Sequence, residues 1–262
     1  MAEYETLLYE EDEGVALVTL NRPEVHNAFD TRMRSELGEL WERVRDRDEV
    51  RCVVLTGAGD QAFCTGIDRN DIPEGVDFDP LRFEDPGRDL GPKSKGVWKP
   101  VIAAVNGIAC GGAFYMLGES DFMIAAEEAT FFDPHVTYGM TAVYEPILML
   151  PRMPFGELMR MAVTGTHERI SARRAYEIGL VSEVVPGPEL LEAARRVART
   201  IASQPARAVQ TTVRVLWTAR DLSLRHALDL GGEFLGLGTR ADDVREGQEG
   251  FASGKRTEWR VR

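Results

Sequence analysis

The sequence predicts an α/β fold in which helices cover the sheets and a helical region follows them. In the first part of the chain, short apolar runs rich in β-branched residues alternate with segments of helical period. From about Pro188 onward the strand-like runs stop and only helical patterns continue. The 262 residues suffice for one large domain with a continuous buried core.

The first part is expected to contain four strands and, between the first two of them, a helix. Asp30 is a candidate N-cap, and apolar residues repeat at helical spacing from Met33 to Val44. The strand candidates are bounded by turn residues and rich in β-branched side chains. They are Val15–Leu20, Cys52–Leu55, Val101–Val105 and Phe122–Ala125.

The last part of the chain is expected to be helical throughout. Leu190, Ala194, Val197 and Ile201 form one apolar stripe. Helical patterns continue over Pro205–Arg220 and Leu222–Leu235, the first of which begins with a proline. We therefore divide the chain into a core, residues 1–187, and a C-terminal helical region, residues 188–262.

The segment Asn70–Lys99 shows neither the hydrophobic period of a helix nor that of a strand. It carries several prolines among acidic residues and glycines. A loop of this length inside a compact domain is either a lid over a site or a disordered insertion, and the sequence leaves both open.

The net charge of −12 argues against nucleic acid or an anionic membrane as partner, because both bind through lysine and arginine. No apolar run is long enough to span a bilayer, and Met1–Gly14 does not resemble a secretory signal. The cysteines Cys52, Cys64 and Cys110 are odd in number and far apart, which favours reduced thiols over disulfides or a metal pair. A soluble, cytoplasmic protein is expected.

Two glycine clusters are candidates for ligand contact. Gly57–Ala62 matches the dinucleotide pattern GxGxxA, but Gly66 and Pro73 follow too soon for the helix that the pattern requires, so a tight turn explains it better. Gly111-Gly112 lies between the strand-like Ile108-Ala109-Cys110 and a helical segment that starts at Ala113. Glycines there allow a ligand to approach backbone N–H groups, although a plain strand-to-helix turn has the same pattern.

The order of several motifs carries a family resemblance. Asn21-Arg22-Pro23 with Asn27-Ala28, then Phe63–Asp68, the Gly111-Gly112 pair, Thr164-Gly165 and Gly179-Leu180-Val181 follow one another along the chain. In this order they resemble the crotonase superfamily, best known for enoyl-CoA hydratase. The resemblance implies a spiral of ββα turns followed by a C-terminal helical trimerisation region, usually assembled as a homotrimer or a dimer of trimers.

The resemblance also implies an acyl-CoA ligand and an oxyanion hole. By motif, the backbone N–H groups of Ile67 and Gly112 would hold the thioester oxygen and stabilise an enolate. Contacts to CoA would come from Val25, Ala28, Thr65, Gly66, Asp68 and Gly111. The C-terminal Phe251 and Lys255, followed by Arg256, resemble the family's ending, where such residues from a neighbouring subunit help to hold the nucleotide; a solvated tail is the alternative. No cofactor is expected beyond the CoA that the substrate itself carries, and no metal.

The chain departs from the hydratase pattern at the acid/base positions. Tyr115 stands where the first of the two family glutamates is expected, and His135 where the second is. The glycine-rich turn of the form PGxGG is replaced by Ala142–Pro146, which adds Tyr144 and Glu145 as candidates. A histidine titrates near neutral pH and can act as general base where tyrosine cannot. Asp133, two residues away, is expected on the other face of a strand, which leaves Tyr144 or Glu145 to orient His135.

Three functions remain open from the sequence. The first is hydration or isomerisation of an enoyl-CoA, with an enolate held by Ile67 and Gly112 and with His135 as acid/base. The second keeps this site but hydrolyses a C–C bond or a thioester, because a histidine at this position also resembles a branch of the superfamily that cleaves cyclic β-diketones. The third is a non-catalytic acyl-CoA-binding subunit, suggested by the loss of both glutamates.

Overall fold

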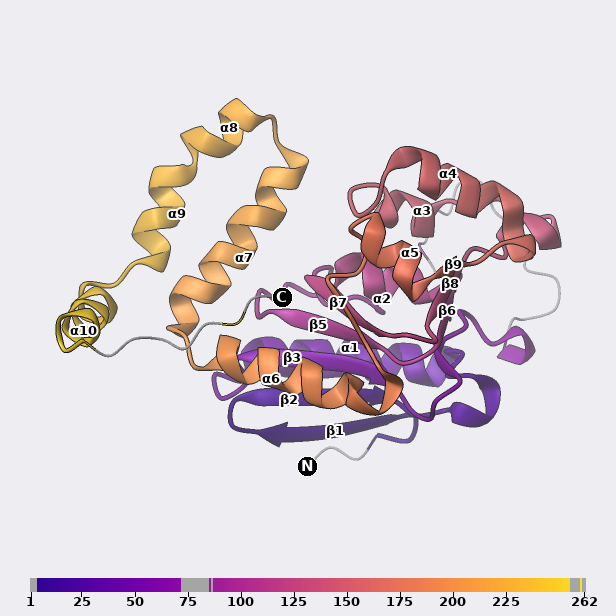
Figure 1. Ribbon diagram of the computed structural model, residues 1–262, viewed down its shortest axis with the longest axis horizontal. Helices are drawn as coiled ribbons and strands as arrows, with labels where there is room; N and C mark the ends of the chain where they lie inside the picture. The colour runs from indigo at the N-terminus through magenta and orange to yellow at the C-terminus, as the bar shows by residue number, and fades with distance from the viewer. Residues whose placement is uncertain (1–3, 72–84, 86, 255–259, 261–262) are drawn as a thin grey trace.

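The computed structural model describes residues 4–71, 85, 87–254 and 260. Two sheets are flanked by helices, and an arm of helices projects from one side of this core (Figure 1). The mixed α/β class predicted from the sequence is confirmed.

The larger sheet has six strands within the described part of the chain, and all but the first run parallel. From one edge to the other they are β1 (Leu7–Asp12), β2 (Val15–Leu20), β3 (Cys52–Gly57), β5 (Val101–Val105), β7 (Phe122–Ala126) and β10 (Glu183–Val185). The predicted strands coincide with β2 and β5 and underestimate β3 by two residues and β7 by one.

The smaller sheet has four strands among the described residues: β4 (Ala62–Cys64), β6 (Ile108–Cys110), β8 (Thr130–Phe132) and β9 (Ile170–Ser171). Each of the pairs β3/β4, β5/β6 and β7/β8 contributes one strand to each sheet, and the added strands pair in parallel. The chain therefore winds in a spiral. No helix follows Gly57 before β4 starts, which confirms a turn at the GxGxxA segment.

Helices cover both faces of this spiral. Their bounds are α1 (Thr31–Asp46), α2 (Ala113–Glu119), α3 (Tyr144–Met149), α4 (Phe155–Thr164), α5 (Ala172–Glu177), α6 (Leu190–Ala202), α7 (Ala206–Asp221), α8 (Leu224–Asp229), α9 (Gly231–Gly238) and α10 (Ala241–Ala252). Single 3-10 turns are η1 (Pro23–Val25), η2 (Arg69–Asp71), η3 (His135–Tyr138), η4 (Gly165–His167) and η5 (Gly187–Glu189). Asp30 caps α1 as predicted, because its Oδ1 accepts from Met33 N at 2.8 Å. None of the described helices is both long and apolar enough to cross a lipid bilayer.

The core forms on the two faces of the larger sheet. On one face, α1 and α2 bury Trp41, Phe114 and their neighbours together with side chains of both sheets. On the other face, α6 lies across β2, β3, β5 and β7 and buries Leu190, Ala194 and Ala198. Although α6 opens the C-terminal helical region, it is part of the core packing. The use of residues 188–262 for oligomerisation stays a prediction.

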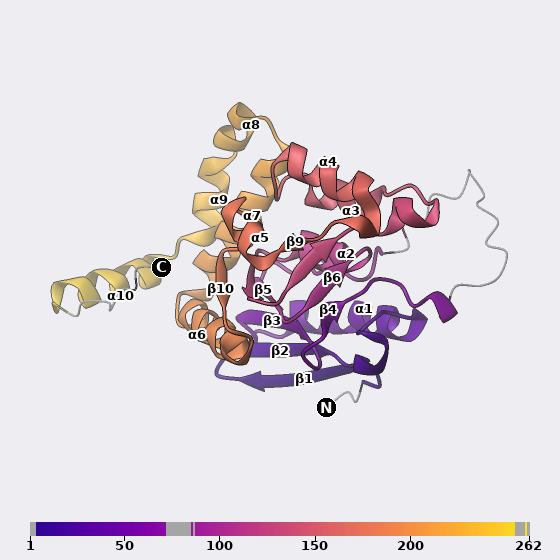
Figure 2. The same ribbon diagram turned by 45° about the vertical axis from the view of Figure 1, so that its right-hand side comes forward.

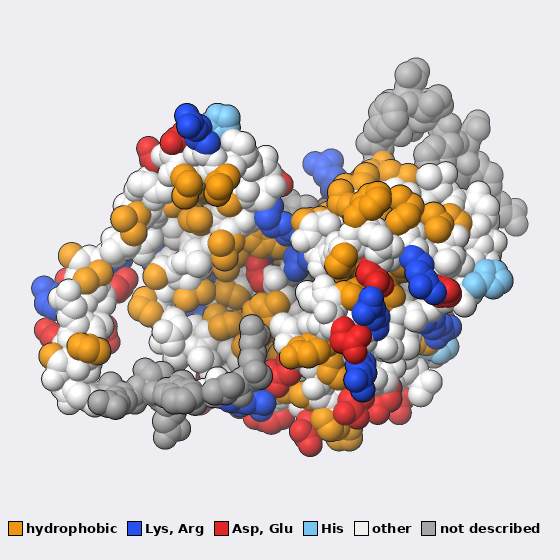
Figure 3. Space-filling model, turned by 45° about the horizontal axis from the view of Figure 1, so that its top comes forward, with side chains coloured by type: hydrophobic (Ala, Val, Ile, Leu, Met, Phe, Trp, Pro, Cys, Tyr) orange, Lys and Arg blue, Asp and Glu red, His pale blue; other side chains and the backbone are white. Residues whose placement is uncertain are grey.

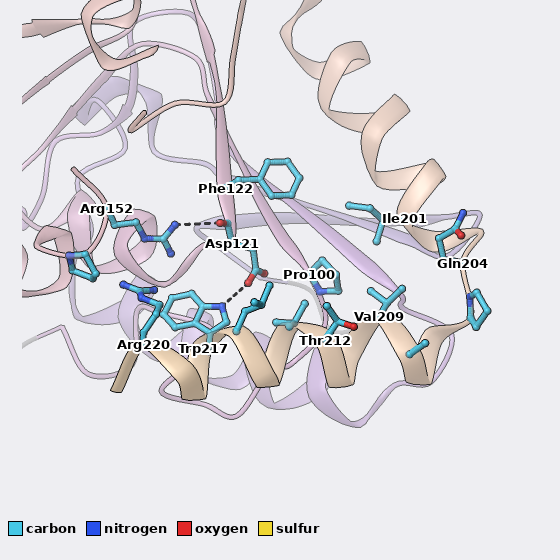
Figure 4. A pocket seen from close by; sticks show the side chains of 15 residues that line it. Pro100, Asp121, Phe122, Arg152, Ile201, Gln204, Val209, Thr212, Trp217 and Arg220 are labelled. Carbon is cyan, nitrogen blue, oxygen red and sulfur yellow. Dashed lines mark hydrogen bonds between the residues drawn. The ribbon is translucent and has the colours of Figure 1, made fainter. Parts of the chain in front are cut away.

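Helices α7 to α10 form the arm, which extends away from the core in both ribbon views (Figures 1 and 2). Trp217 attaches α7 to the core by donating from Nε1 to Asp121 Oδ1 at 2.6 Å, beside Arg152 and Arg220 (Figure 4). Between α7 and the sheet lies a largely apolar groove of about 680 Å³. Hydrophobic side chains also gather on the outside of the arm and on the neighbouring core (Figure 3).

The segment Asn70–Lys99 is only partly described, since residues 72–84 and 86 lie outside the described residues. Residues 87–99 form turns that pack into the core: Leu90 and Val97 are fully buried, and Trp41 Nε1 donates to Leu90 O at 3.0 Å. For residues 87–99, neither a lid nor a disordered insertion is correct. Their burial was missed because isolated apolar residues in a turn give no period.

Candidate active site

Two backbone amides, those of Ile67 and Gly112, belong to segments that approach each other at Gly66; we call them the amide pair. Gly66 O accepts from Phe29 N, and Asp68 N donates to Phe29 O, both at 2.8 Å. In a parallel ladder, the backbone N–H groups of successive residues point alternately toward and away from the partner strand. Ile67 lies between Gly66 and Asp68, which both bond to Phe29, so the N–H of Ile67 points away from Phe29. Neither amide of the pair donates a hydrogen bond to any described residue.

Glycines allow the two segments of the amide pair to approach each other. Gly66 has a positive φ of 89°, and a Cβ built on it would lie 2.9 Å from the backbone nitrogen of Gly112. A Cβ on Gly112 would lie 2.5 Å from the ring of Phe29. A side chain at either position would therefore push the two segments apart.

Three side chains form what we call the acid/base cluster: Asp133, His135 and Glu145. Strand β8 ends at Phe132, and His135 opens the turn η3. Asp133 Oδ1 accepts from the backbone nitrogen of His135 at 3.0 Å and contacts its ring Nδ1 at 2.6 Å. The expectation that Asp133 points away from His135 is wrong: residues two positions apart share a face even in a strand, and here β8 ends at Phe132 and the chain turns at Pro134 so that His135 contacts the carboxylate.

Glu145 reaches the same histidine from the other side. It lies in the first turn of α3, is buried, and places Oε1 at 3.5 Å from His135 Nε2. The contact with Asp133 raises the pKa of His135, against the opposing effect of its burial. Burial raises the pKa of Glu145, and the nearby His135 charge opposes this. His135 and Glu145 are thus both biased toward their protonated forms.

Tyr115 on α2 and Tyr144 on α3 complete the surroundings of Glu145, with ring centroids 6.4 Å apart. The Tyr115 hydroxyl is buried, with the side chain of Asp85 near it. Burial raises the pKa of Tyr115 above its ordinary value, and the charges of Glu145 and Asp85 raise it further. Tyr115 therefore stays protonated and is no base. The predicted candidates His135, Tyr115, Tyr144 and Glu145 do come together in space.

The amide pair and the acid/base cluster are adjacent. A Cβ built on Gly111 would lie 3.9 Å from His135 Cε1 and 3.5 Å from Pro134. The His135 ring therefore lies beside the Gly111-Gly112 turn. In the described part of the chain, no group of three or more His, Cys, Asp or Glu side chains is arranged to hold a metal ion.

A cleft of about 600 Å³ is lined by Ile67 of the amide pair and by Pro134, next to His135. Val25, Ala28, Thr65, Ile67 and Asp68, all predicted as site residues, line it. The carboxylate of Asp68 is engaged by Arg22 Nη2 at 2.9 Å, so Asp68 is held within the wall. Cys110 also lines the cleft, and burial raises the pKa of its thiol to about 12. All three cysteines are buried and free.

Two arginines of this cleft were not among the residues predicted from the sequence. The guanidinium of Arg69 lies 3.7 Å from the centroid of the Tyr138 ring, and that of Arg169 lies 4.5 Å from the centroid of Phe132. Both residues line the cleft. They stand 100 positions apart in the sequence, and only the fold places both on the wall of one cleft, so no local signal identified them.

Of the C-terminal candidates, the described Phe251 does not line this cleft. Phe251 is 89% exposed and belongs to α10, at the far end of the arm from the cleft (Figures 1 and 2). Lys255 and Arg256 lie outside the described residues. Contacts from these residues to a ligand stay a prediction.

The chain is similar to known proteins over nearly its whole length. A family model described as enoyl-CoA hydratase/isomerase matches residues 10–262. An (E)-benzylidenesuccinyl-CoA hydratase of Thauera aromatica is 37% identical over 90% of this chain and 92% of its own length. A 1,2-epoxyphenylacetyl-CoA isomerase of Escherichia coli K12 is 34% identical over 94% of this chain and 95% of its own.

A solved structure supports the same assignment. An enoyl-CoA hydratase/isomerase from Mycobacterium paratuberculosis superposes with a TM-score of 0.88 at 36% identity, covering 99% of this chain and all of that one. The chain therefore belongs to the enoyl-CoA hydratase/isomerase family of the crotonase superfamily, and it is an enzyme of that type.

Proposed function

We propose that this enzyme adds water to, or moves a proton within, an enoyl-CoA thioester. The observation that carries the proposal is that the two unengaged amides of Ile67 and Gly112 lie beside the His135–Glu145 pair. The thioester oxygen accepts from both amides, so negative charge that develops on it during the reaction is stabilised. Preorganised donors of this kind contribute about 2.7–4 kcal/mol each.

The His135–Glu145 pair supplies the proton chemistry. In hydration, the hydroxyl of water bonds to the β carbon, the remaining water proton passes to a base, and an acid gives a proton to the α carbon. One proton enters the pair and one leaves it, so the pair returns to its starting state after each turnover. A pair whose members both favour protonation is suited to hold that proton at neutral pH.

The cleft is proposed to hold the CoA portion. Its phosphates are anions, and a protein of net charge −12 needs local cations to bind them. Arg69 and Arg169 supply such cations on the cleft wall. The proposal requires no cofactor apart from the CoA that the substrate brings.

Assembly as a homotrimer or a dimer of trimers, and a cytoplasmic location, stay predictions. Support for assembly comes from the arm, where Leu224, Leu228 and Leu235 are each at least 67% exposed. Apolar side chains left so exposed on a projecting arm are typical of a surface that another subunit covers.

Hydrolysis of a C–C bond or a thioester is the second candidate. The Asp133–His135 contact favours it, because a histidine oriented by a carboxylate is the arrangement that activates water in many hydrolases. The non-catalytic alternative is abandoned, since the relatives are named as enzymes.

The test is turnover of a panel of enoyl-CoA thioesters. Because two of the relatives carry phenyl-containing acyl groups in their names, the panel includes cinnamoyl-CoA beside short and long straight-chain esters. We expect loss of the absorbance of the conjugated thioester with at least one ester, and far slower loss with His135→Ala. Absence of turnover above that variant across the panel would refute the proposal.

A further inference from the structure

Asp133 is the most deeply buried charged group of the acid/base cluster. Its exposed fraction is 0%, and its Oδ1 contacts both the backbone nitrogen and the ring Nδ1 of His135. Its Oδ2 is buried and has no hydrogen-bond partner among the described residues. Burying a carboxylate with one oxygen unpaired is costly, and such a cost points to a use at the site rather than to support of the fold.

The hydrogen-bond pattern fixes the state of the histidine ring. Asp133 Oδ1 receives the backbone N–H of His135, so this oxygen acts as an acceptor, and ring Nδ1 must be the donor to it. With the proton on Nδ1, the neutral ring presents the lone pair of Nε2 toward Glu145, whose Oε1 is 3.5 Å away.

We infer that Asp133 is a positioning residue that holds His135 with Nδ1 protonated, so that Nε2 and Glu145 Oε1 share the proton that is exchanged in the reaction. The inference rests on the proposed function and adds a role that the hydratase pattern of two glutamates does not contain. Asp133 acts through His135 and needs no contact with the substrate.

The charges around His135 favour this role. Asp133 approaches from the end of β8 and Glu145 from α3, while Tyr115 on α2 and Tyr144 on α3 surround Glu145. Asp85 acts on Glu145 with the same sign as Asp133. The cations Arg69 and Arg169 act on the neighbouring Cys110 and face the cleft. Two carboxylates in contact with one imidazole stabilise its cation, in line with its raised pKa.

Asp133→Asn is the informative variant, because the amide has the shape of the carboxylate but no charge. Its side chain can also donate to Nδ1, which would move the ring proton to Nε2. We expect kcat to fall about 10²- to 10⁴-fold with KM changed less than about threefold. The pH dependence of kcat should move so that the histidine titrates at lower pH, and a merely structural role would not shift that profile.

A nitrogen-15 NMR titration of the histidines tests the same inference without an activity assay. His135→Gln assigns the His135 signals among the four histidines. In the wild-type protein the neutral ring should carry its proton on Nδ1, and in Asp133→Asn the pKa of His135 should fall toward its ordinary value of 6.5. Glu36→Gln is the matched control: Glu36 is buried and also accepts backbone N–H groups, but lies on α1 away from the cleft.

The outcomes separate the inference from the proposed function. A neutral wild-type ring protonated on Nε2, or an unchanged His135 titration in a folded Asp133→Asn, would overturn the role of Asp133 whatever the enzyme turns over. If Asp133→Asn does not fold, the wild-type tautomer alone decides. If the tautomer and titration are as expected but no enoyl-CoA is turned over, the positioning role stands and the proposed reaction fails.

Discussion

The two parts of the candidate site, the amide pair and the acid/base cluster, differ in the chemical groups that form them. The amide pair consists of backbone N–H groups, held by Gly66 and Gly112 and by the Phe29 bridge. The acid/base cluster consists of side chains from two separate segments, Asp133–His135 and Glu145. A backbone donor persists through almost any change of side chain, whereas a proton relay changes with each substitution. The two unengaged amides can therefore persist while the side chains beside them vary, and in this chain those side chains are Asp133, His135 and Glu145.

Removing the central side chain of the acid/base cluster should have the largest effect. His135→Ala is expected to lower kcat about 10²- to 10⁴-fold, the usual contribution of general acid/base catalysis, with little change in KM. His167→Ala changes an exposed histidine and should leave kcat unaltered. Steady-state kinetics on the best enoyl-CoA substrate checks both variants. A His135→Ala enzyme with nearly full kcat would refute the catalytic role of the acid/base cluster.

Disturbing the amide pair should have the next largest effect. Gly66→Ala places a methyl group 2.9 Å from the Gly112 nitrogen and should lower kcat about 10²- to 10³-fold. It should also cost about 1–2 kcal/mol of unfolding free energy, because Gly66 has a φ of 89°.

Gly179→Ala is the control for Gly66→Ala. Gly179 has a φ of 80°, but no heavy atom lies within 4 Å of the position that the added methyl group would take, so it shares the backbone strain without the contact. Urea unfolding should show a loss for both variants, the larger one for Gly66→Ala because of its added contact, and kinetics a loss of kcat for Gly66→Ala alone. Equal loss of kcat in both would mean that general destabilisation, and not the amide pair, accounts for the effect.

A smaller effect is expected from the arginines of the cleft. Arg69→Gln and Arg169→Gln should each raise KM for an acyl-CoA about tenfold, or about 1.4 kcal/mol, close to the low end for a hydrogen bond to a charged group. KM for the matching acyl-pantetheine thioester, which lacks the nucleotide phosphates, should not change. Arg160→Gln alters an exposed arginine paired with Glu168 and serves as control. Equal effects on both thioesters would show that these arginines do not recognise phosphate.

The smallest effect concerns stability and pH. The folded protein raises the pKa of Glu145 from its ordinary 4.5, mainly by burial, so the native state favours the protonated form and loses stability as pH rises through that raised pKa. Glu145→Gln carries no such charge. Its unfolding free energy relative to wild type should therefore increase from pH 4 to pH 8, as measured by urea denaturation.

For Glu36 the expected change of stability with pH has the opposite sign to that for Glu145. Burial alone would raise the pKa of Glu36, but hydrogen bonds from Thr6 and the backbone outweigh burial and lower the pKa. Glu36→Gln should therefore become less stable relative to wild type as pH rises. If the unfolding free energies of Glu145→Gln and Glu36→Gln, each relative to wild type, changed in the same direction with pH, the conclusion that a charged Glu145 destabilises the folded state would be contradicted.

The sequence predicts best what is local. The helix cap at Asp30 and the strands β2 and β5 each depend on a few neighbouring residues, and all were identified. The amide pair also lies in two short motifs, Thr65-Gly66 and Gly111-Gly112, and its position follows from them through the resemblance to the crotonase superfamily. In the structure, the two amides donate no hydrogen bond to a described residue, as the motifs lead us to expect.

What the sequence does not predict depends on contacts between distant segments or on where an element ends. The Asp133–His135 contact depends on where β8 ends, at Phe132, and on the turn at Pro134; strand alternation does not exclude it, because residues two positions apart share a face. Arg69 and Arg169 share a cleft only because of the folded arrangement. The long segment before β5 was expected to be irregular and is so from residue 87, but its buried Leu90 could be recognised only from its packing against α1.

The most direct test of the account is the mass of the product formed from an enoyl-CoA in water enriched in oxygen-18. We predict a 3-hydroxyacyl-CoA that carries one labelled oxygen in its hydroxyl group, or an unlabelled isomer that chromatography separates from the substrate, and formation of either about 100-fold or more slower with His135→Ala or Gly66→Ala. Release of free CoA together with a carboxylic acid that carries the label would contradict the account, because water would then have attacked the thioester carbon and no enolate would be required.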